Sequence, residues 1–244
     1  MHKADVENMT KKDLVDHDVA FWGVPCQAFS TMGHLNPGDQ KRSLVHQVPR
    51  MTRGWRPGYV VIENVPGIQT ALGGSVWEQF VKAMRGEGYY LHWSQELLAA
   101  ELGPPQGRRR FFAIFVQGKA RMAIALRKPR RVGRKRSLST FLGVQVQREI
   151  AKTVRCGGYG TSPLDFAHNW THYLKTGKSG VARHHFYELT QGDTLRLQGR
   201  NMRTKLPDQQ RAARTLIGNA IPVQMVRAVI RAIADHSKWS SAPN

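Results

Sequence analysis

Three short apolar runs constrain the fold most strongly, because each has the length of one β-strand. Residues 18–24 read Asp-Val-Ala-Phe-Trp-Gly-Val, residues 59–65 read Tyr-Val-Val-Ile-Glu-Asn-Val, and residues 111–116 read Phe-Phe-Ala-Ile-Phe-Val. The first two runs are each followed by proline, and short apolar runs closed by turn residues are typical of buried strands. Helical stretches lie between and after these runs, so residues 1–118 are predicted to form an α/β sheet.

Two helices can be predicted from apolar residues at helical spacing. The first is expected to have Ser75 as its N-cap and to end at Gly86 and Gly88. Its apolar face carries Val76, Phe80, Val81 and Met84. The second is opened by Pro222, near the end of the chain, and carries Val226, Val229, Ile230 and Ile233.

Residues 119–207 differ in character from the segments on either side. They contain the basic run at 127–136 (Arg-Lys-Pro-Arg-Arg-Val-Gly-Arg-Lys-Arg), many glycines and little hydrophobic periodicity. Such a run is usually a solvated tail or linker, but in a chain this basic a surface that faces DNA is at least as consistent with it. The chain is therefore predicted to have a core, residues 1–118 and 208–244, and a smaller domain, residues 119–207.

The charge balance favours a polyanionic partner. The chain has 37 Lys and Arg residues against 17 Asp and Glu residues, which gives a formal net charge of +20 and a pI near 10.7. Basic side chains set against phosphates release condensed counterions, so this excess favours nucleic acid. A ribosomal-type protein or a merely soluble basic protein would show the same excess, and charge alone separates these classes poorly.

Cysteine usage and hydropathy exclude several other classes. Cys26 and Cys156, the two cysteines, give no disulfide framework, and no Cys/His spacing resembles a zinc site, so no metal is expected. No run approaches the roughly 18–20 apolar residues of a membrane span. Residues 1–18 are too polar for a secretory signal. A cytoplasmic protein with no membrane partner is expected.

A cysteine follows the first predicted strand directly, within Gly-Val-Pro-Cys-Gln-Ala-Phe-Ser at residues 23–30. A lone cysteine is usually a small buried hydrophobe. Here its neighbours are loop residues, and open α/β sheets place their ligands at the carboxyl ends of parallel strands. The pattern Gly-x-Pro-Cys-Gln-x-Phe-Ser resembles the nucleophile motif of the DNA cytosine-5 methyltransferases. This resemblance assigns Cys26 as the nucleophile and implies that Gln27 and Ser30 contact DNA.

Two further segments resemble motifs of the same family. Residues 63–65 (Glu-Asn-Val) are similar to the motif whose carboxyl group holds the N3 and amino edge of the target base. Residues 106–110 (Gln-Gly-Arg-Arg-Arg) are similar to the family's Gln-x-Arg-x-Arg. Taken alone, the first segment could be a solvated turn, and the second could be an ordinary basic segment that leads into a strand. The resemblance assigns Glu63 to the base, Arg110 to the cytosine O2, and Arg108 to support of the same pocket.

The resemblance continues toward the end of the chain. Leu189-Thr190 and residues 196–199 (Arg-Leu-Gln-Gly) match a family segment, with Asp193 where Glu is usual and Arg200-Asn201 where Phe-Pro is usual. Residues 218–222 (Gly-Asn-Ala-Ile-Pro) resemble the motif that closes over the cofactor, which assigns Asn219 and Ala220 to cofactor binding. Near the start, Asp5 resembles an acid that lies near the adenine.

Residues 153–160 (Thr-Val-Arg-Cys-Gly-Gly-Tyr-Gly) lie in the position of the family's target recognition domain. No helical pattern follows them and no acidic residue stands at the usual distance, so these glycines do not indicate a nucleotide loop. The segment is interpreted as a loop facing DNA, with Arg155, Gly157 and Gly158 as contacts and Cys156 as structural.

The resemblance implies a Rossmann-like methyltransferase core that uses S-adenosylmethionine, with a target recognition domain at residues 119–207. The substrate it implies is double-stranded DNA. In such an enzyme the Cys26 thiolate attacks C6 of a flipped-out cytosine, Glu63 and Arg110 stabilise the activated ring, and C5 receives the methyl group.

One family motif has no match in this chain. The first strand and its Phe-x-Gly-x-Gly loop, which bind the methionine part of the cofactor, are missing, so the core is expected to be N-terminally incomplete. Residues 18–24 would then have an unpaired apolar edge. A complementary polypeptide carrying the loop, a chain that starts late, or a catalytically inactive remnant that only binds DNA would each account for this. A generic basic nucleic-acid-binding protein is disfavoured by five motif matches in order.

Overall fold

The computed structural model describes residues 8–10, 13, 16–23, 43–118, 137–155, 172–174 and 186–240. The chain divides into two compact units. Unit 1 takes the described residues of Met1–Leu97, Arg110–Ala125 and Ile233–Asn244. Unit 2 takes those of Leu98–Arg109 and Leu126–Ala232.

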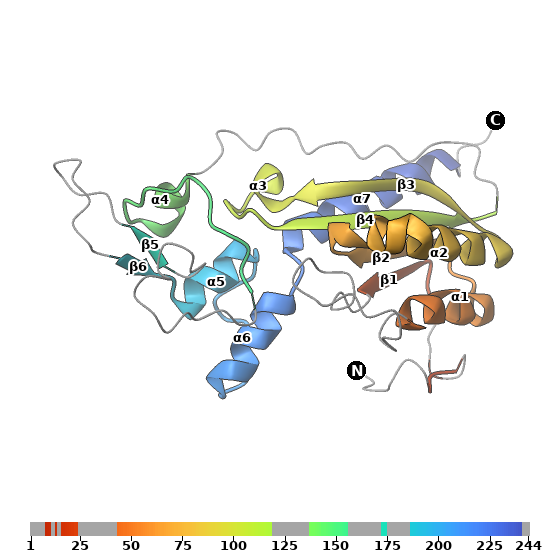
Figure 1. The fold of residues 1–244 in the computed structure, drawn as a ribbon, viewed down its shortest axis with the longest axis horizontal. Coiled ribbons are helices and arrows are strands. Elements are labelled where there is room, and N and C mark those ends of the chain that lie inside the picture. Colours follow the sequence, from red (N-terminus) through yellow and green to blue (C-terminus); the bar gives the residue numbers. More distant parts are fainter. Residues whose placement is uncertain are drawn as a thin grey trace. The chain divides into compact units, whose positions relative to one another are not determined.

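Unit 1 is built on a four-stranded sheet with the order β1-β2-β4-β3 (Figure 1). The strands are β1 (Val19–Gly23), β2 (Tyr59–Asn64), β3 (Tyr89–Leu98) and β4 (Arg109–Gln117). β1 and β2 are parallel, whereas β2 and β4 are antiparallel. The three predicted strands are therefore confirmed as β1, β2 and β4. The sequence does not predict β3, because polar residues interrupt it and few of its side chains are buried.

One face of this sheet carries the core of unit 1. The strand register aligns two rows of apolar side chains across β1, β2 and β4: Ala20, Val60 and Phe115, then Trp22, Ile62 and Ala113. The helix α2 (Ser75–Gly86) adds Val76, Phe80 and Met84 to the same core, and α1 (Ser43–Trp55) adds Val48. The apolar face predicted for α2 is thus confirmed, with Val81 partly buried against it.

The prediction of Ser75 as an N-cap is wrong by one residue. Two short 3-10 helices, η3 (Pro66–Gln69) and η4 (Ala71–Gly74), lead into α2, and Gly74 is its N-cap. Gly74 has φ +90°, a left-handed conformation that strains any residue with a Cβ, so glycine is favoured there. The Ser75 hydroxyl instead donates to the Leu72 carbonyl at 2.9 Å.

Unit 2 has a separate core formed by short elements. These are α3 (Ala99–Leu102), α4 (Leu138–Leu142), α5 (Gln191–Leu197), α6 (Gln210–Asn219) and the antiparallel pair β5 (His172–Leu174) and β6 (Phe186–Glu188). Its buried cluster consists of Leu138, Leu142, Val146, Ala151, Val154, Leu189, Leu195, Leu197 and Ile217. Several of these residues come from loops, which explains why the sequence shows little periodicity here.

The last helix, α7 (Val223–Ser240), begins directly after Pro222, as predicted. Its buried apolar residues are Met225, Val229, Ala232 and Ile233, while Ile230 is 39% exposed. The stretch Gln210–His236 is long and apolar enough for a membrane span by length and composition. That is weak evidence, because the stretch contains two helices and most of the apolar residues of α7 named above are buried within the protein.

The units do not coincide with the predicted domains. Unit 2 also contains residues 98–109 and 208–232, which the sequence analysis assigns to the core. The assignment of residues 119–207 to target recognition therefore stays a prediction, and the basic run at 127–136 lies outside the described residues.

Candidate active site

An ion pair between Glu63 and Arg110 lies where β2 ends, in unit 1. The Arg110 Nε donates to Glu63 Oε1 at 2.9 Å, and the two side chains are only 15% and 10% exposed, respectively. β2 brings Glu63 beside Gly23 of β1 and Phe112 of β4. The antiparallel pairing of β2 with β4 thus unites two motifs that are far apart in the sequence.

The pair has the chemistry to recognise the polar edge of a planar ring. A carboxylate accepts hydrogen bonds, and a guanidinium offers several donors in one plane. Holding both ions away from water is costly unless their geometry is good, and the 2.9 Å contact satisfies that condition. The Asn64 side chain also accepts a hydrogen bond from the Val65 backbone N–H at 2.8 Å, which fixes the turn after the strand.

The chain enters the predicted nucleophile loop beside this pair. Gly23 is the last residue of β1, and a Cβ added to it would lie 3.7 Å from Glu63 Oε2. Several predicted site residues lie outside the described residues: Asp5, Cys26, Gln27, Ser30, Gly157 and Gly158.

Arg108 lies in unit 2 and is 1% exposed. Its guanidinium donates to the carbonyls of Val154, at 2.9 Å, and Gly218, at 3.0 Å. It therefore ties the predicted DNA-facing segment to the predicted cofactor-closing turn within one unit. The resemblance gives Arg108 a role in the base pocket, whereas these contacts describe a residue that positions backbone.

Gln106 is the first residue of the Gln-x-Arg-x-Arg segment, but the resemblance assigns it no role. Its side chain is fully buried, donates to the Leu197 carbonyl at 2.9 Å and accepts from the Val154 N–H at 3.2 Å. A glutamine just before a basic segment that leads into a strand could have suggested these hydrogen bonds, because a buried amide must satisfy both its donor and its acceptor.

The predicted cofactor residues Asn219 and Ala220 follow one another at the end of α6. They line an open depression of about 650 Å³, together with Arg200, Arg211 and Leu216. Gln198 supports this turn with two hydrogen bonds. Its side-chain amide donates to the Ile217 carbonyl at 2.8 Å, and its backbone carbonyl accepts from the Val223 N–H at 3.0 Å.

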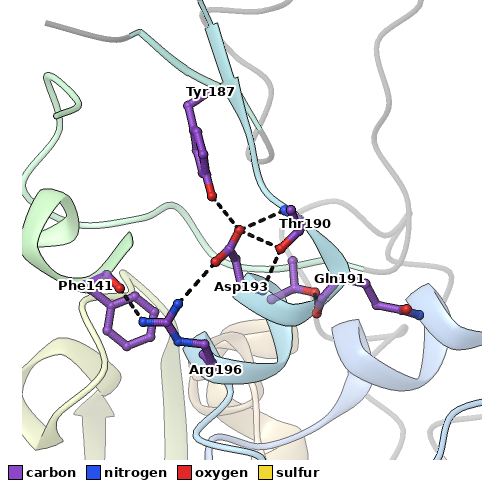
Figure 2. Close-up of polar contacts among 7 residues, drawn as sticks. Phe141, Tyr187, Thr190, Gln191, Asp193 and Arg196 are labelled. Carbon is purple, nitrogen blue, oxygen red and sulfur yellow. Dashed lines mark hydrogen bonds and ion pairs between the residues drawn. The ribbon is translucent and has the colours of Figure 1, made fainter. Parts of the chain in front are cut away.

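A buried carboxylate organises the start of α5 in unit 2, as Figure 2 shows. Asp193 forms a capping box with Thr190 and accepts a hydrogen bond from the Tyr187 hydroxyl at 2.8 Å. Arg196 lies 3.5 Å from the same carboxylate and stacks over Phe141, whose carbonyl it also contacts. Burial, with the bond to Asp193, raises the pKa of Tyr187 to about 12. Aspartate is therefore accommodated where glutamate is usual in the family.

Comparison with known proteins supports the sequence motifs. Residues 1–154 match the family described as C-5 cytosine-specific DNA methylase. The chain is 24% identical to the type II methyltransferase M.DsaV of Dactylococcopsis salina, over 94% of this chain and 72% of that protein. It is 25% identical to the type II methyltransferase M1.ScrFI of Lactococcus lactis subsp. cremoris, over 92% of this chain and 64% of that protein.

The fold agrees with a solved methyltransferase structure. The methyltransferase EhMeth of Entamoeba histolytica superposes with a TM-score of 0.69, covering 95% of this chain and 82% of that protein at 12% identity. At this identity the likeness concerns the fold alone, and it confirms the predicted α/β, Rossmann-like methyltransferase class.

Proposed function

This chain belongs to the C-5 cytosine-specific DNA methylase family, and we propose that it transfers a methyl group from S-adenosylmethionine to C5 of a flipped-out cytosine in double-stranded DNA. The observation that carries the proposal is the Glu63–Arg110 pair at the end of β2. It lies beside the strand that leads into the Cys26 loop. Cys26 is three positions after Gly23, and three residues span at most about 11 Å, so the thiol and the ion pair can serve one base.

The reaction requires activation of a ring whose C5 is a poor nucleophile. The Cys26 thiolate forms a bond to C6, and electron density moves toward N3 and C5. Glu63 holds or supplies a proton at N3, while Arg110 stabilises the charge on O2. Once C5 has gained the methyl group, its proton leaves as the C6–sulfur bond breaks, which restores the ring and releases the Cys26 thiolate.

Asp5, Asn219 and Ala220 would hold the methyl donor. S-adenosylmethionine, the donor general to this family, supplies an electrophilic methyl group when bound. Asn219 offers amide hydrogen bonds, and the depression that it lines includes Leu216, which is 54% exposed. An exposed apolar side chain beside an amide suits an adenine ring, because the ring needs both apolar contact and polar recognition at its edge.

The family's Gly-rich cofactor loop would come from a segment outside these 244 residues, either upstream in a longer polypeptide or on a complementary one. The chain spans 72% and 64% of the two curated relatives compared above. In the described part of the sheet, β1 is at one end of the strand order and pairs only with β2. Most side chains of β1 are only partly buried, whereas those of β2 are almost all buried. β1 is therefore an edge strand of the described sheet, to which a further strand can pair.

DNA would be held by the basic surface of the chain, in keeping with its net charge of +20. The proposed contacts are Gln27 and Ser30 in the nucleophile loop and Arg155, Gly157 and Gly158 in residues 119–207. Action on DNA without a membrane partner is consistent with a cytoplasmic protein.

The direct test is to detect the product. The chain, supplied with a polypeptide carrying the cofactor loop, is incubated with labelled S-adenosylmethionine and duplex DNA, which is then digested to nucleosides. Mass spectrometry should find labelled 5-methyldeoxycytidine, and none from DNA whose cytosines already carry the methyl group. If the chain binds duplex DNA but gives no labelled nucleoside, the inactive DNA-binding module is the better account.

A further inference from the structure

We propose that a pocket in unit 2 binds one phosphodiester group of the DNA backbone, with Arg155 and Arg214 as its cationic ligands. This inference rests on the proposed function, because it takes DNA as the substrate. The pocket has a volume of about 320 Å³. Its two arginines come from segments far apart in the sequence, the loop after Val154 and the helix α6.

The pocket has an apolar floor and a polar rim. Val154, Leu189 and Ile217 line it and belong to the buried core of unit 2. Arg155 is exposed and Arg214 half-buried, so both guanidinium groups belong to the rim. A planar guanidinium can bind two phosphate oxygens at once, which makes arginine well suited to a phosphodiester.

Positive charge is concentrated beside the pocket. Burial lowers the pKa of Lys152, and repulsion from Arg148 and Arg155 lowers it further. Partial burial also lowers the pKa of Arg155, although the residue as a whole is exposed. Lys152 and the two arginines that repel it would gain from an anion bound close to them, and a bound phosphate would provide it.

The charge of the lining suits a phosphodiester better than a free phosphate. The lining includes two arginines and one glutamate, Glu188, which leaves one net positive charge. A backbone phosphodiester carries one negative charge, whereas a phosphate monoester carries about 1.5 to 2 at neutral pH. The charge balance therefore favours a group within a nucleic acid strand.

The polar wall of the pocket is held in place before any ligand binds. Thr190, Gln191 and Thr194 line it from the start of α5. Their helix is fixed by the Asp193 network, in which the carboxylate accepts from the Thr190 backbone N–H at 3.0 Å and from the Thr190 hydroxyl at 2.7 Å (Figure 2). A wall ordered in advance lowers the entropic cost of binding.

The test is the salt dependence of DNA binding. The affinity of the full chain for a fluorescently labelled duplex is measured by anisotropy across a series of salt concentrations. Arg155→Gln and Arg214→Gln should each weaken binding and reduce the slope of log K against log salt by about 0.9, the value for one lost phosphate contact. Arg155→Lys and Arg214→Lys keep the charge and should retain most of the slope.

Arg227→Gln is the matched control, because Arg227 is an exposed arginine of unit 2 that lines neither this pocket nor the depression beside Asn219. It should leave the slope unchanged. An equal loss for Arg227→Gln, or no loss for folded Arg155→Gln and Arg214→Gln, would overturn the inference. Methyl transfer with unaltered slopes would refute the pocket and leave the proposed function standing, whereas a wild-type chain that does not bind duplex DNA would refute both.

Discussion

At the scale of single residues, Glu63 and Arg110 show what sequence motifs can and cannot supply. Each belongs to a motif that indicates a role at the base, so the residue types are predictable. Their 2.9 Å contact is not, because it depends on the antiparallel register of β2 with β4. The same holds for Arg108: the resemblance assigns it to support of the base pocket, but its hydrogen bonds to two backbone carbonyls in unit 2 are not predictable from the motif.

Glu63→Gln tests the role of the ion pair. The amide keeps the size of the side chain but removes its charge, so it can neither stabilise a proton at N3 nor balance the poorly exposed Arg110 guanidinium. Methyl transfer should fall by about 10²–10⁴-fold, the usual contribution of a positioned acid or base. The free energy of unfolding should fall by roughly 1–3 kcal/mol, measured by chemical denaturation.

Glu87→Gln serves as the control for this variant. It breaks an ion pair in which the Arg53 Nε lies 2.9 Å from Glu87 Oε2 and the Arg53 side chain is 74% exposed. The Glu87 side chain is only 14% exposed, but solvent screens a pair whose cation is this accessible. Methyl transfer should therefore stay near wild type, and the loss of stability should be smaller than for Glu63→Gln. Equal activity of Glu63→Gln and Glu87→Gln would contradict a catalytic role for Glu63.

At the scale of secondary structure, the predictable elements are those with a buried pattern. β2 and β4 are almost continuously buried, and α2 repeats its apolar residues at helical spacing, so their sequences reveal them. α1 contains Pro49 within the helix, a residue that usually ends one, and β3 is mostly accessible. The position of each helix end depends on local backbone geometry, as Gly74 shows for α2.

Gly199→Ala tests how α5 ends against its neighbour. Gly199 has φ +68°, and an added Cβ would lie 2.0 Å from Gln224 Oε1. Gly143, after α4, has a similar φ of +73°, but a Cβ added there would have no neighbouring atom within 4 Å. Gly143→Ala therefore measures the backbone strain alone, without a steric clash. Gly199→Ala should destabilise the chain by about 1–3 kcal/mol more than Gly143→Ala.

The comparison is completed by repeating Gly199→Ala in a Gln224→Ala background. There the contact is removed, and the cost should fall to that of Gly143→Ala in the same denaturation experiment. Equal costs in the wild-type background would mean that the Gln224 side chain moves aside without a penalty.

At the scale of the whole molecule, the sequence predicts the α/β class and the family, and the comparisons confirm both. The two compact units are not predictable in the same way. Their division at Leu97 and Arg110 depends on which buried side chains share a core. The side chains of Gln106 and Arg108 also form hydrogen bonds with residues 46, 91 and 110 positions further along the chain. Such contacts have no local signature in the sequence.

The central claim, that Cys26 attacks the cytosine ring, is tested most directly by trapping the bond it forms. The chain, with S-adenosylmethionine and a polypeptide carrying the cofactor loop, is incubated with duplex DNA containing 5-fluorocytosine, whose C5 has no proton to lose. Mass spectrometry should find a covalent protein–DNA adduct on Cys26, present in Cys156→Ser and absent in Cys26→Ser. An adduct that persists in Cys26→Ser, or none with the wild-type chain, would contradict the account.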